Sequence, residues 1–328
     1  MIVVKGLRRT GKSSLLRVGL SECGFPYLLI DSRALGSFSP DRAYDLMASS
    51  LSKLVERHRS LLEFLRKVRE VYISGGVAAV SVGFLSRERR ALVEVLERLN
   101  EWGESRGSFV VLALDEAQEF RFYPRFTSIL AYVYDHLRWV KVVMAGSEVG
   151  VLDKFLGREE PKAPLYGRPY VEIEMRRLSR EKALEFLKLG FEEAGVKPEN
   201  VEEAVNVFDG VIGWLTSYGY YALRVGHKEA LKRVLDEAVS LVKDEVESFL
   251  ALRKQARDRY LTILQLISTP MRWSDVKRGV TAKLGVKVSD KQLSNYLAEL
   301  VNYGLAVNQG GKYVIADPII AEAVSRMR

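Results

Sequence analysis

The sequence predicts an α/β fold with a parallel sheet flanked by helices, followed by an all-α lid and a C-terminal winged helix-turn-helix. Three observations predict it. A glycine-rich loop joins a short apolar run to a helical stretch, and an apolar run ending in two acidic residues follows about a hundred residues later. From Ser179 onward the pattern is helical. We therefore expect a core of residues 1–176, a lid of residues 177–252 and a winged helix-turn-helix of residues 253–328.

The first element is a phosphate-binding loop. Residues 6–13 read Gly-Leu-Arg-Arg-Thr-Gly-Lys-Ser, the pattern of P-loop nucleoside triphosphatases, directly after the apolar run Ile2 to Val4. Its glycines let backbone N–H groups turn toward an anion, and the following helix adds the positive end of its dipole. We expect Lys12 to reach the β- and γ-phosphates and the Ser13 hydroxyl to ligate Mg²⁺. The residues expected to bind the nucleotide are Gly6, Leu7, Arg8, Arg9, Thr10, Gly11, Lys12, Ser13 and Ser14.

The second motif is a strand that ends in two carboxylates. Residues 109–114 are apolar throughout, as in a strand buried on both faces, and Asp115 and Glu116 follow. Ligands bind at the carboxyl ends of parallel strands, so we expect Asp115 to face Mg²⁺. Glu116 is expected to polarise an attacking water as general base. The alternative is a surface strand that ends in two solvated acids.

The other core elements follow from apolar periodicity. We expect strands at residues 27–30 and 140–145, an edge strand at residues 170–174, and helices over residues 41–70 and 87–102. Residues 71–85 carry no charge, but the adjacent glycines Gly75 and Gly76 favour a small hairpin over a membrane segment.

The last quarter of the chain is basic. From Leu250 onward there are 13 Lys/Arg against 6 Asp/Glu, a net charge of +7 within a total of +8. The lid is predicted to contain helices at residues 180–194, 198–208, 214–225 and 228–252. The winged helix is predicted to contain helices at residues 260–267, 273–284 and 289–303, and a hairpin turning at residues 308–311.

Such a module suggests DNA as a partner. The helix from Ser289 would then present Lys291, Gln292 and Asn295 to a major groove, and Lys312 on the wing would contact phosphate. The alternative is a protein-binding or autoinhibitory module with the same fold.

Composition excludes several classes of protein. The single cysteine, Cys23, excludes a disulfide framework and a cysteine-rich zinc site, fits a reducing cytoplasm, and is expected to be buried. No apolar run reaches the roughly 20 residues of a membrane-spanning helix, so we expect no membrane partner and a cytoplasmic location. No Asn-Lys-x-Asp motif for reading guanine occurs.

With these motifs in hand, the chain resembles the archaeal-type P-loop ATPases of the STAND class, relatives of the AAA+ proteins. The blocks that carry the resemblance are residues 6–16 with their double arginine, 114–118, 145–147, 164–168, Gly213-Trp214-Leu215 and Asp317-Pro318. It implies an ATP-dependent conformational switch, with Ser147 reading the γ-phosphate and Arg168 contacting it from the start of the last strand. The alternatives are a loop-capping hydroxyl for Ser147 and, for Arg168, a strand-end arginine that pairs with a surface acid.

The chain departs from the family at two places. The family commonly has a proline where this chain has Ile212, which implies a differently built coupling between nucleotide and lid. Family members also carry a Gly-Arg-Glu stretch before the first strand that helps to hold the adenine. This chain begins at the strand itself, so either its start lies upstream or the lid holds the adenine.

We therefore expect the chain to bind ATP·Mg²⁺ between its sheet and its lid, to hydrolyse it slowly, and to use the bound state to reposition the basic winged helix. Lys12 and Arg168 would stabilise charge on the transferring phosphoryl group while Glu116 orients water. A non-hydrolysing, nucleotide-dependent DNA-binding regulator and a small-molecule kinase are the alternatives. The sequence leaves open a protein partner or a homo-oligomer.

Overall fold

The computed structural model describes residues 1–35, 40–75, 80–123, 125–197 and 199–327. Within these residues the chain divides into two compact units. Unit 1 consists of Met1–Gly6, Lys12–Ser147 and Val151–Glu174, and unit 2 of Leu7–Gly11, Glu148–Gly150 and Met175–Arg328, whose last residue lies outside the described range.

Unit 1 is built on a sheet whose described strands run in the order β2–β5–β6–β1–β7. The strands are β1 (Ile2–Gly6), β2 (Tyr27–Asp31), β5 (Val110–Asp115), β6 (Val140–Gly146) and β7 (Val171–Met175). β2, β5, β6 and β1 pair in parallel, with Asp31 opposite Asp115 and Lys5 opposite Gly146. The predicted parallel sheet is confirmed, and β7 is its edge strand beside β1.

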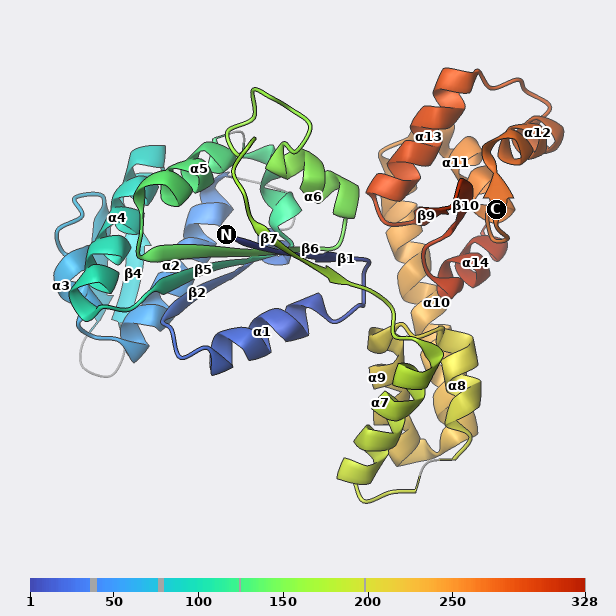
Figure 1. Ribbon diagram of the computed structural model, residues 1–328, viewed down its shortest axis with the longest axis horizontal. Coiled ribbons are helices and arrows are strands. Elements are labelled where there is room, and N and C mark those ends of the chain that lie inside the picture. The colour runs from blue at the N-terminus through green and yellow to red at the C-terminus, as the bar shows by residue number, and fades with distance from the viewer. Residues whose placement is uncertain (36–39, 76–79, 124, 198, 328) are drawn as a thin grey trace. The chain divides into compact units, whose positions relative to one another are not determined.

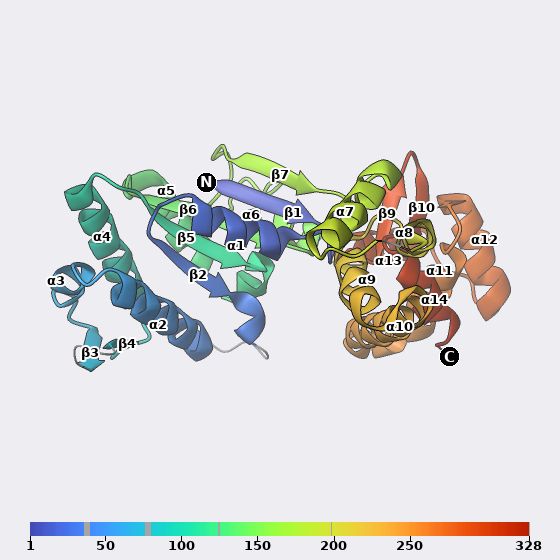
Figure 2. The same cartoon turned by 90° about the horizontal axis from the view of Figure 1, so that it is seen from below.

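Helices cover both faces of this sheet. α1 lies on one face, and α5 and α6 lie on the other (Figures 1 and 2). The described helical elements of unit 1 are α1 (Lys12–Glu22), η1 (Ser32–Leu35), α2 (Pro40–Arg57), α3 (Leu61–Leu65), α4 (Arg89–Arg106), η2 (Ala117–Phe122), α5 (Phe126–His136) and α6 (Val149–Leu156). Buried strand and helix residues form one hydrophobic core.

One expectation about unit 1 changes in detail, and another is confirmed. The helix predicted over residues 41–70 is broken after Arg57, where α2 ends, and α3 begins at Leu61. In the turn between them, Ser60 Oγ accepts a hydrogen bond from the indole Nε1 of Trp102 on α4 at 3.0 Å. The predicted hairpin is confirmed as the antiparallel pair β3 (Val71–Gly75) and β4 (Val80–Phe84). Its Gly76 lies outside the described residues.

Unit 2 contains the predicted lid and winged helix. Its described elements are α7 (Arg180–Glu193), α8 (Val201–Phe208), α9 (Ile212–Val225), α10 (His227–Ala251), η3 (Lys254–Ala256), α11 (Arg257–Leu266), β8 (Met271–Arg272), α12 (Trp273–Leu284), α13 (Asp290–Asn302), β9 (Ala306–Gln309), β10 (Lys312–Ile315) and α14 (Pro318–Ser325). Residue 198, the expected start of the second lid helix, lies outside the described residues.

The C-terminal half of unit 2 is a winged helix-turn-helix. β9 and β10 pair in antiparallel fashion, with Gln309 opposite Lys312. The two residues between them, Gly310 and Gly311, have φ of 57° and 81°, the left-handed conformation that a tight hairpin turn requires. α14 was not predicted. Asp317 caps it by accepting a hydrogen bond from the Ile319 N–H at 2.9 Å.

The lid and the winged helix share one hydrophobic core. The long helix α10 provides the link, because it packs on α9 and also on α14 (Figure 1). The boundary expected between residues 252 and 253 therefore stays a prediction.

Two findings bear on the classes excluded above. Among the described helices, none is both long and apolar enough to cross a membrane. Cys23 is exposed, so the expectation that it is buried was wrong. It follows the end of α1, where its Sγ donates to the Leu20 carbonyl oxygen at 3.4 Å.

The core of unit 1 predicts a difference between two leucines. Leu112 in β5 is 1% exposed, whereas Leu85 is 66% exposed. Leu112→Ala should lower the free energy of unfolding by about 2–5 kcal/mol, because it leaves a cavity in the sheet. The matched change Leu85→Ala should cost less than about 0.5 kcal/mol. Urea unfolding of both variants measures the difference, and equal midpoints would contradict this assignment of the core.

Candidate active site

Three neighbouring strands bring the predicted phosphate and metal residues to one edge of the sheet. β1 leads into the phosphate loop, β6 is followed by Ser147, and β5 ends at Asp115, with Glu116 next. Because β6 pairs in parallel with both β1 and β5, the carboxyl ends of the three strands lie side by side. Lys12, the first residue of α1, is 4% exposed.

The loop has a tight local conformation. The Thr10 hydroxyl donates to the Leu7 carbonyl oxygen at 2.8 Å and so closes the turn. Positive φ occurs at Arg9 (63°) and Gly11 (88°). The sequence suggested unusual dihedrals at both glycines of the motif, but Gly6 ends β1 and is not among the residues with positive φ. Arg9, and not Gly6, is therefore the second loop residue with a left-handed backbone.

A hydroxyl and a carboxylate form the candidate metal position. Ser13 is hydrogen-bonded to Asp115, whose Oδ1 is buried and has no hydrogen-bond partner among the residues that the structure describes. Burial is the main cause that raises the pKa of Asp115, the nearby Glu116 adds to it, and Ser13 and Arg33 oppose it. A buried, unpartnered carboxylate oxygen beside a hydroxyl suits a hard divalent cation that keeps most of its ligands from phosphate and water. No cluster of three or more potential metal-binding side chains occurs among the described residues.

Arg33 is a site residue that sequence reasoning missed. It follows the end of β2 and pairs with Asp31 at 2.6 Å, and its guanidinium lies 3.4 Å from Asp115 Oδ2. Asp31 stands opposite Asp115 in the sheet, so the pairing of β2 with β5 brings this cation to the second acidic strand end. Its only signal in the sequence was a basic residue two positions after a strand that ends in Asp.

Glu116 has a left-handed backbone conformation, and its carboxylate accepts three hydrogen bonds. Its φ of 53° is left-handed. Its Oε2 accepts hydrogen bonds from Ser147 Oγ at 2.7 Å, from Ser147 N at 2.9 Å and from Gln118 Nε2 at 2.6 Å. Ser147 therefore belongs to the site, where its hydroxyl contacts the expected general base. Gln118 stood in the motif without an assigned role.

Arg168 lies apart from the group formed by Ser13, Asp115, Glu116 and Ser147. Its guanidinium pairs with Asp135 near the end of α5, with Nε 2.9 Å from Oδ1, and this ion pair lowers the pKa of Asp135. Both residues precede the strands β6 and β7, at the amino ends rather than the carboxyl ends. This is the alternative raised above, a strand-end arginine that pairs with a surface acid. The γ-phosphate role of Arg168 remains a prediction that no contact supports.

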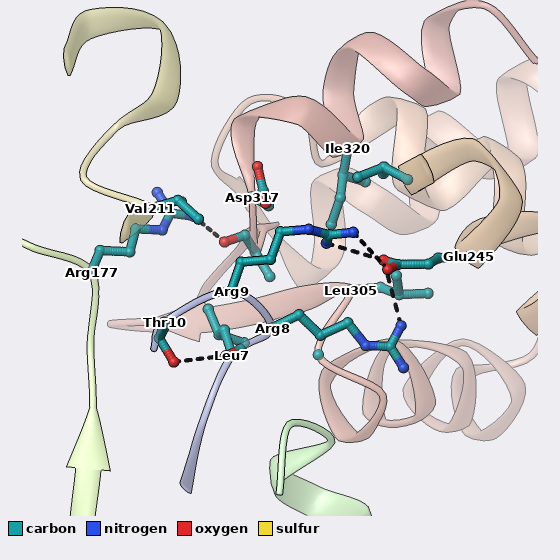
Figure 3. Close-up of a pocket in the computed structure, with 13 residues that line it drawn as sticks. Leu7, Arg8, Arg9, Thr10, Arg177, Val211, Glu245, Leu305, Asp317 and Ile320 are labelled. Atoms are coloured by element: carbon teal, nitrogen blue, oxygen red, sulfur yellow. Dashed lines mark hydrogen bonds and ion pairs between the residues drawn. The ribbon is translucent and has the colours of Figure 1, made fainter. Parts of the chain in front are cut away.

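The middle of the loop packs within unit 2 (Figure 3). Arg9 makes two contacts to Glu245 on α10, at 2.7 and 3.3 Å, and Arg8 lies 3.5 Å from the same carboxylate. The Arg9 carbonyl oxygen accepts a hydrogen bond from Gly213 N at 2.9 Å. A Cβ on Gly213 would lie 2.8 Å from the Arg9 Cβ, so only glycine fits this approach.

A tryptophan extends this cluster to the winged helix. The Arg9 guanidinium lies over the Trp214 ring, 4.2 Å from its centroid. The indole Nε1 donates to Asp317 Oδ2 at 2.9 Å, and the same carboxylate caps α14. Burial raises the pKa of Asp317 despite these hydrogen bonds. One chain of contacts thus joins the loop to the first turn of α14.

The expected DNA contacts are exposed on the winged helix. Lys291 and Asn295 are exposed on α13, and Lys312 is exposed at the start of β10. Gln292 is also exposed, but it forms a capping box with Ser289: each side chain bonds the other residue's backbone N–H. Its carbonyl oxygen is therefore engaged at the helix end.

The buried charge of Asp115 predicts a stability effect with a definite sign. Because the pKa of Asp115 is raised in the folded chain, folding favours its protonated form, and this stabilisation is lost as the pH rises through the folded value. Ligand-free Asp115→Asn should therefore unfold at a higher temperature than wild type at pH 7. The difference should shrink toward about pH 4.

Asp135→Asn is the matched control, because the pKa of Asp135 is shifted downward by Arg168. This variant should unfold at a lower temperature than wild type near neutral pH, and its deficit should vanish as the pH falls. Thermal unfolding across pH measures both variants. Destabilisation by Asp115→Asn at pH 7 would contradict the buried-charge assignment.

Comparisons with known proteins agree with the fold described above. Residues 254–315 match the family of the MCM protein C-terminal winged helix-turn-helix domain. No curated protein matches the sequence. The ORC2 protein of Aeropyrum pernix, solved as ADPNP and ADP complexes, is 14% identical with a TM-score of 0.56, over 99% of this chain and 87% of that one, and it shares the fold. The Walker-type ATPase PABY2304 of Pyrococcus abyssi is 33% identical with a TM-score of 0.80, over 99% of this chain and 90% of that one. The chain therefore belongs to the family of Walker-type ATPases that includes this Pyrococcus abyssi protein.

Proposed function

We propose that this protein is an Mg²⁺-dependent ATPase that works as a slow molecular switch. It binds ATP at the loop of residues 6–14, hydrolyses it, and passes the state of the nucleotide to a winged helix that contacts DNA. The observation that carries the hydrolytic part is the group Ser13, Asp115 and Glu116 at one sheet edge, with a buried oxygen of Asp115 left without a hydrogen-bond partner.

Each residue of the group has a separate task. The loop amides and Lys12 bind the phosphates, and Ser13 and Asp115 hold Mg²⁺. When bound, Mg²⁺ neutralises charge on the phosphates. Glu116 takes the proton of the attacking water. The reaction is largely a matter of positioning, so its rate depends on how well these groups are held.

Two substitutions test the separate tasks. Glu116→Gln should lower turnover by about 10²–10⁴-fold, because it removes the proton acceptor, and should leave ATP affinity unchanged. Lys12→Ala should weaken ATP binding itself by about 10–100-fold through loss of a charged hydrogen bond. Phosphate release and calorimetric titration measure the two effects. Unchanged turnover in Glu116→Gln would remove this residue from the role of general base.

The cluster around Arg9 supports the switch part of the proposal. Nucleotide phosphates would lie against the backbone of the loop. In unit 2 Gly213 N bonds that backbone at the Arg9 carbonyl, and Trp214 and Glu245 hold the Arg9 side chain. A change in the loop therefore alters the support of the Trp214 ring, which in turn holds the cap of α14 through Asp317. This gives the two states of the nucleotide a physical route to the winged helix.

The same cluster supports the proposed assignment to the STAND class. The double arginine, the Gly213-Trp214 pair and the Asp317-Pro318 pair, which carried that resemblance, meet in one set of contacts. A phosphate-binding loop alone would need none of them.

The charge of the last quarter supports DNA as the partner. Residues 250–328 have 13 Lys/Arg against 6 Asp/Glu. Lys291, Asn295 and Lys312 are exposed on α13 and the wing, where a winged helix contacts a duplex. Phosphate contacts release counterions, so the binding constant should fall linearly with salt on logarithmic axes.

DNA binding measured across salt, with and without ATP, tests the coupling. We expect a negative salt slope and a difference in affinity between the two nucleotide states. Trp214→Phe keeps an aromatic ring beneath Arg9 but removes the N–H that bonds Asp317. It should retain the salt slope and lose most of the nucleotide dependence.

Trp102→Phe is the control for this substitution. Trp102 is a buried tryptophan of unit 1 whose Nε1 likewise donates to a side chain, that of Ser60. The Trp102→Phe variant should leave the nucleotide dependence of DNA binding intact. A flat salt response would argue against phosphate contacts, and an intact nucleotide effect in Trp214→Phe would remove the indole from the coupling route.

A further inference from the structure

The carboxylate of Glu116 is held by one of its two oxygens. All three hydrogen bonds that it makes within the described part of the chain end on Oε2, with Ser147 Oγ, Ser147 N and Gln118 Nε2 as donors. The residue is half-buried, and no described donor contacts Oε1. The two oxygens therefore have different surroundings: among the described residues, Oε2 accepts three hydrogen bonds and Oε1 accepts none.

The donors are themselves fixed. Gln118 and Ser147 are 2% and 3% exposed. A Cβ on Gly146 would lie 2.4 Å from Gln118 Oε1, so the glycine leaves the space that the amide occupies. Gln118 Oε1 is buried without a hydrogen-bond partner in the described part of the chain, and Gln118 Nε2 donates to Glu116 Oε2. A buried amide that keeps one unsatisfied oxygen is costly to stability, which points to a functional reason for its presence.

The backbone of Glu116 adds a second constraint. A φ of 53° is uncommon for a residue with a long side chain, and it persists only where the surroundings hold it. This conformation immediately after β5 turns the carboxylate toward Ser147 at the end of β6. The orientation of Glu116 is thus set from the backbone and from the carboxylate at once.

We propose that Gln118, together with Ser147, is a positioning residue that fixes Oε2 of Glu116 and thereby reserves Oε1 as the oxygen that accepts the proton of water. The inference rests on the proposed function. In the hydrolysis of ATP, one O–H bond of water breaks and its proton moves to Oε1 of Glu116, while the water oxygen bonds the γ-phosphorus. The bond from that phosphorus to the bridging oxygen breaks, and its electron pair leaves with ADP.

The inference also gives Ser147 a role different from that of a γ-phosphate sensor. Its hydroxyl and its N–H both donate to Glu116. Ser147→Ala removes only the hydroxyl, so a positioning role predicts a lower kcat at unchanged ATP affinity. A sensor that binds the γ-phosphate predicts a loss of preference for ATP over ADP instead.

Gln118→Met tests the proposal most directly, since it keeps length and volume and removes the donor. It should lower kcat by about 10–100-fold, the effect of losing one hydrogen bond to a charged group, with KM and ATP affinity unchanged. A merely structural role of Gln118 would not separate kcat from KM in this way. Gln265→Met is the control, because Gln265 is a partly buried, hydrogen-bonded glutamine of unit 2.

A double-mutant cycle without nucleotide supplies a readout other than activity. Glu116→Gln and Gln118→Met should be non-additive in thermal unfolding, since both remove the same hydrogen bond. Non-additivity together with a lower kcat supports the proposal. If Glu116→Gln is inactive while Gln118→Met keeps wild-type kcat, the positioning role is overturned and the ATPase assignment stands. Absence of phosphate release by wild type would overturn both.

Discussion

The adjacency of three parallel strands is the constraint on which the site depends. β5, β6 and β1 are neighbours with one direction, so an acidic pair, a serine and a phosphate loop that are far apart in the sequence reach the same edge. No side chain has to reach across the sheet for this. The contacts of Ser13 with Asp115 and of Ser147 with Glu116 follow from the strand order.

That edge carries opposing charges in a poorly solvated place. Asp115 is 1% exposed, and burial disfavours its ionised form, while Arg33 approaches it from the next strand and opposes the effect. Arg33 thus places a positive charge of the chain itself beside the buried carboxylate of Asp115. Burial of the Asp115 carboxylate costs stability in the ligand-free protein.

The sequence predicted those parts of the protein that short, contiguous patterns encode. The phosphate loop, the apolar strand with its acidic end, and the wing with its paired glycines each depend on neighbours in the chain. Gln118 could not be assigned, because its role comes from Glu116 being turned by a left-handed backbone. The contact between Arg9 and Trp214 likewise joins residues about two hundred positions apart, and no local rule pairs them. Arg168 was given a catalytic role by resemblance, but it pairs with Asp135.

The tip of the wing has a consequence for how this module could recognise a duplex. Gly310 and Gly311 turn the hairpin with left-handed backbones and carry no side chains. These two residues can offer a partner only their main chain, and the Gly311 N–H already donates to Asn308 Oδ1 at 3.0 Å. Any side-chain contact that the wing makes with a duplex would therefore come from the exposed residues beside the turn, Asn308, Gln309 and Lys312, and not from its tip.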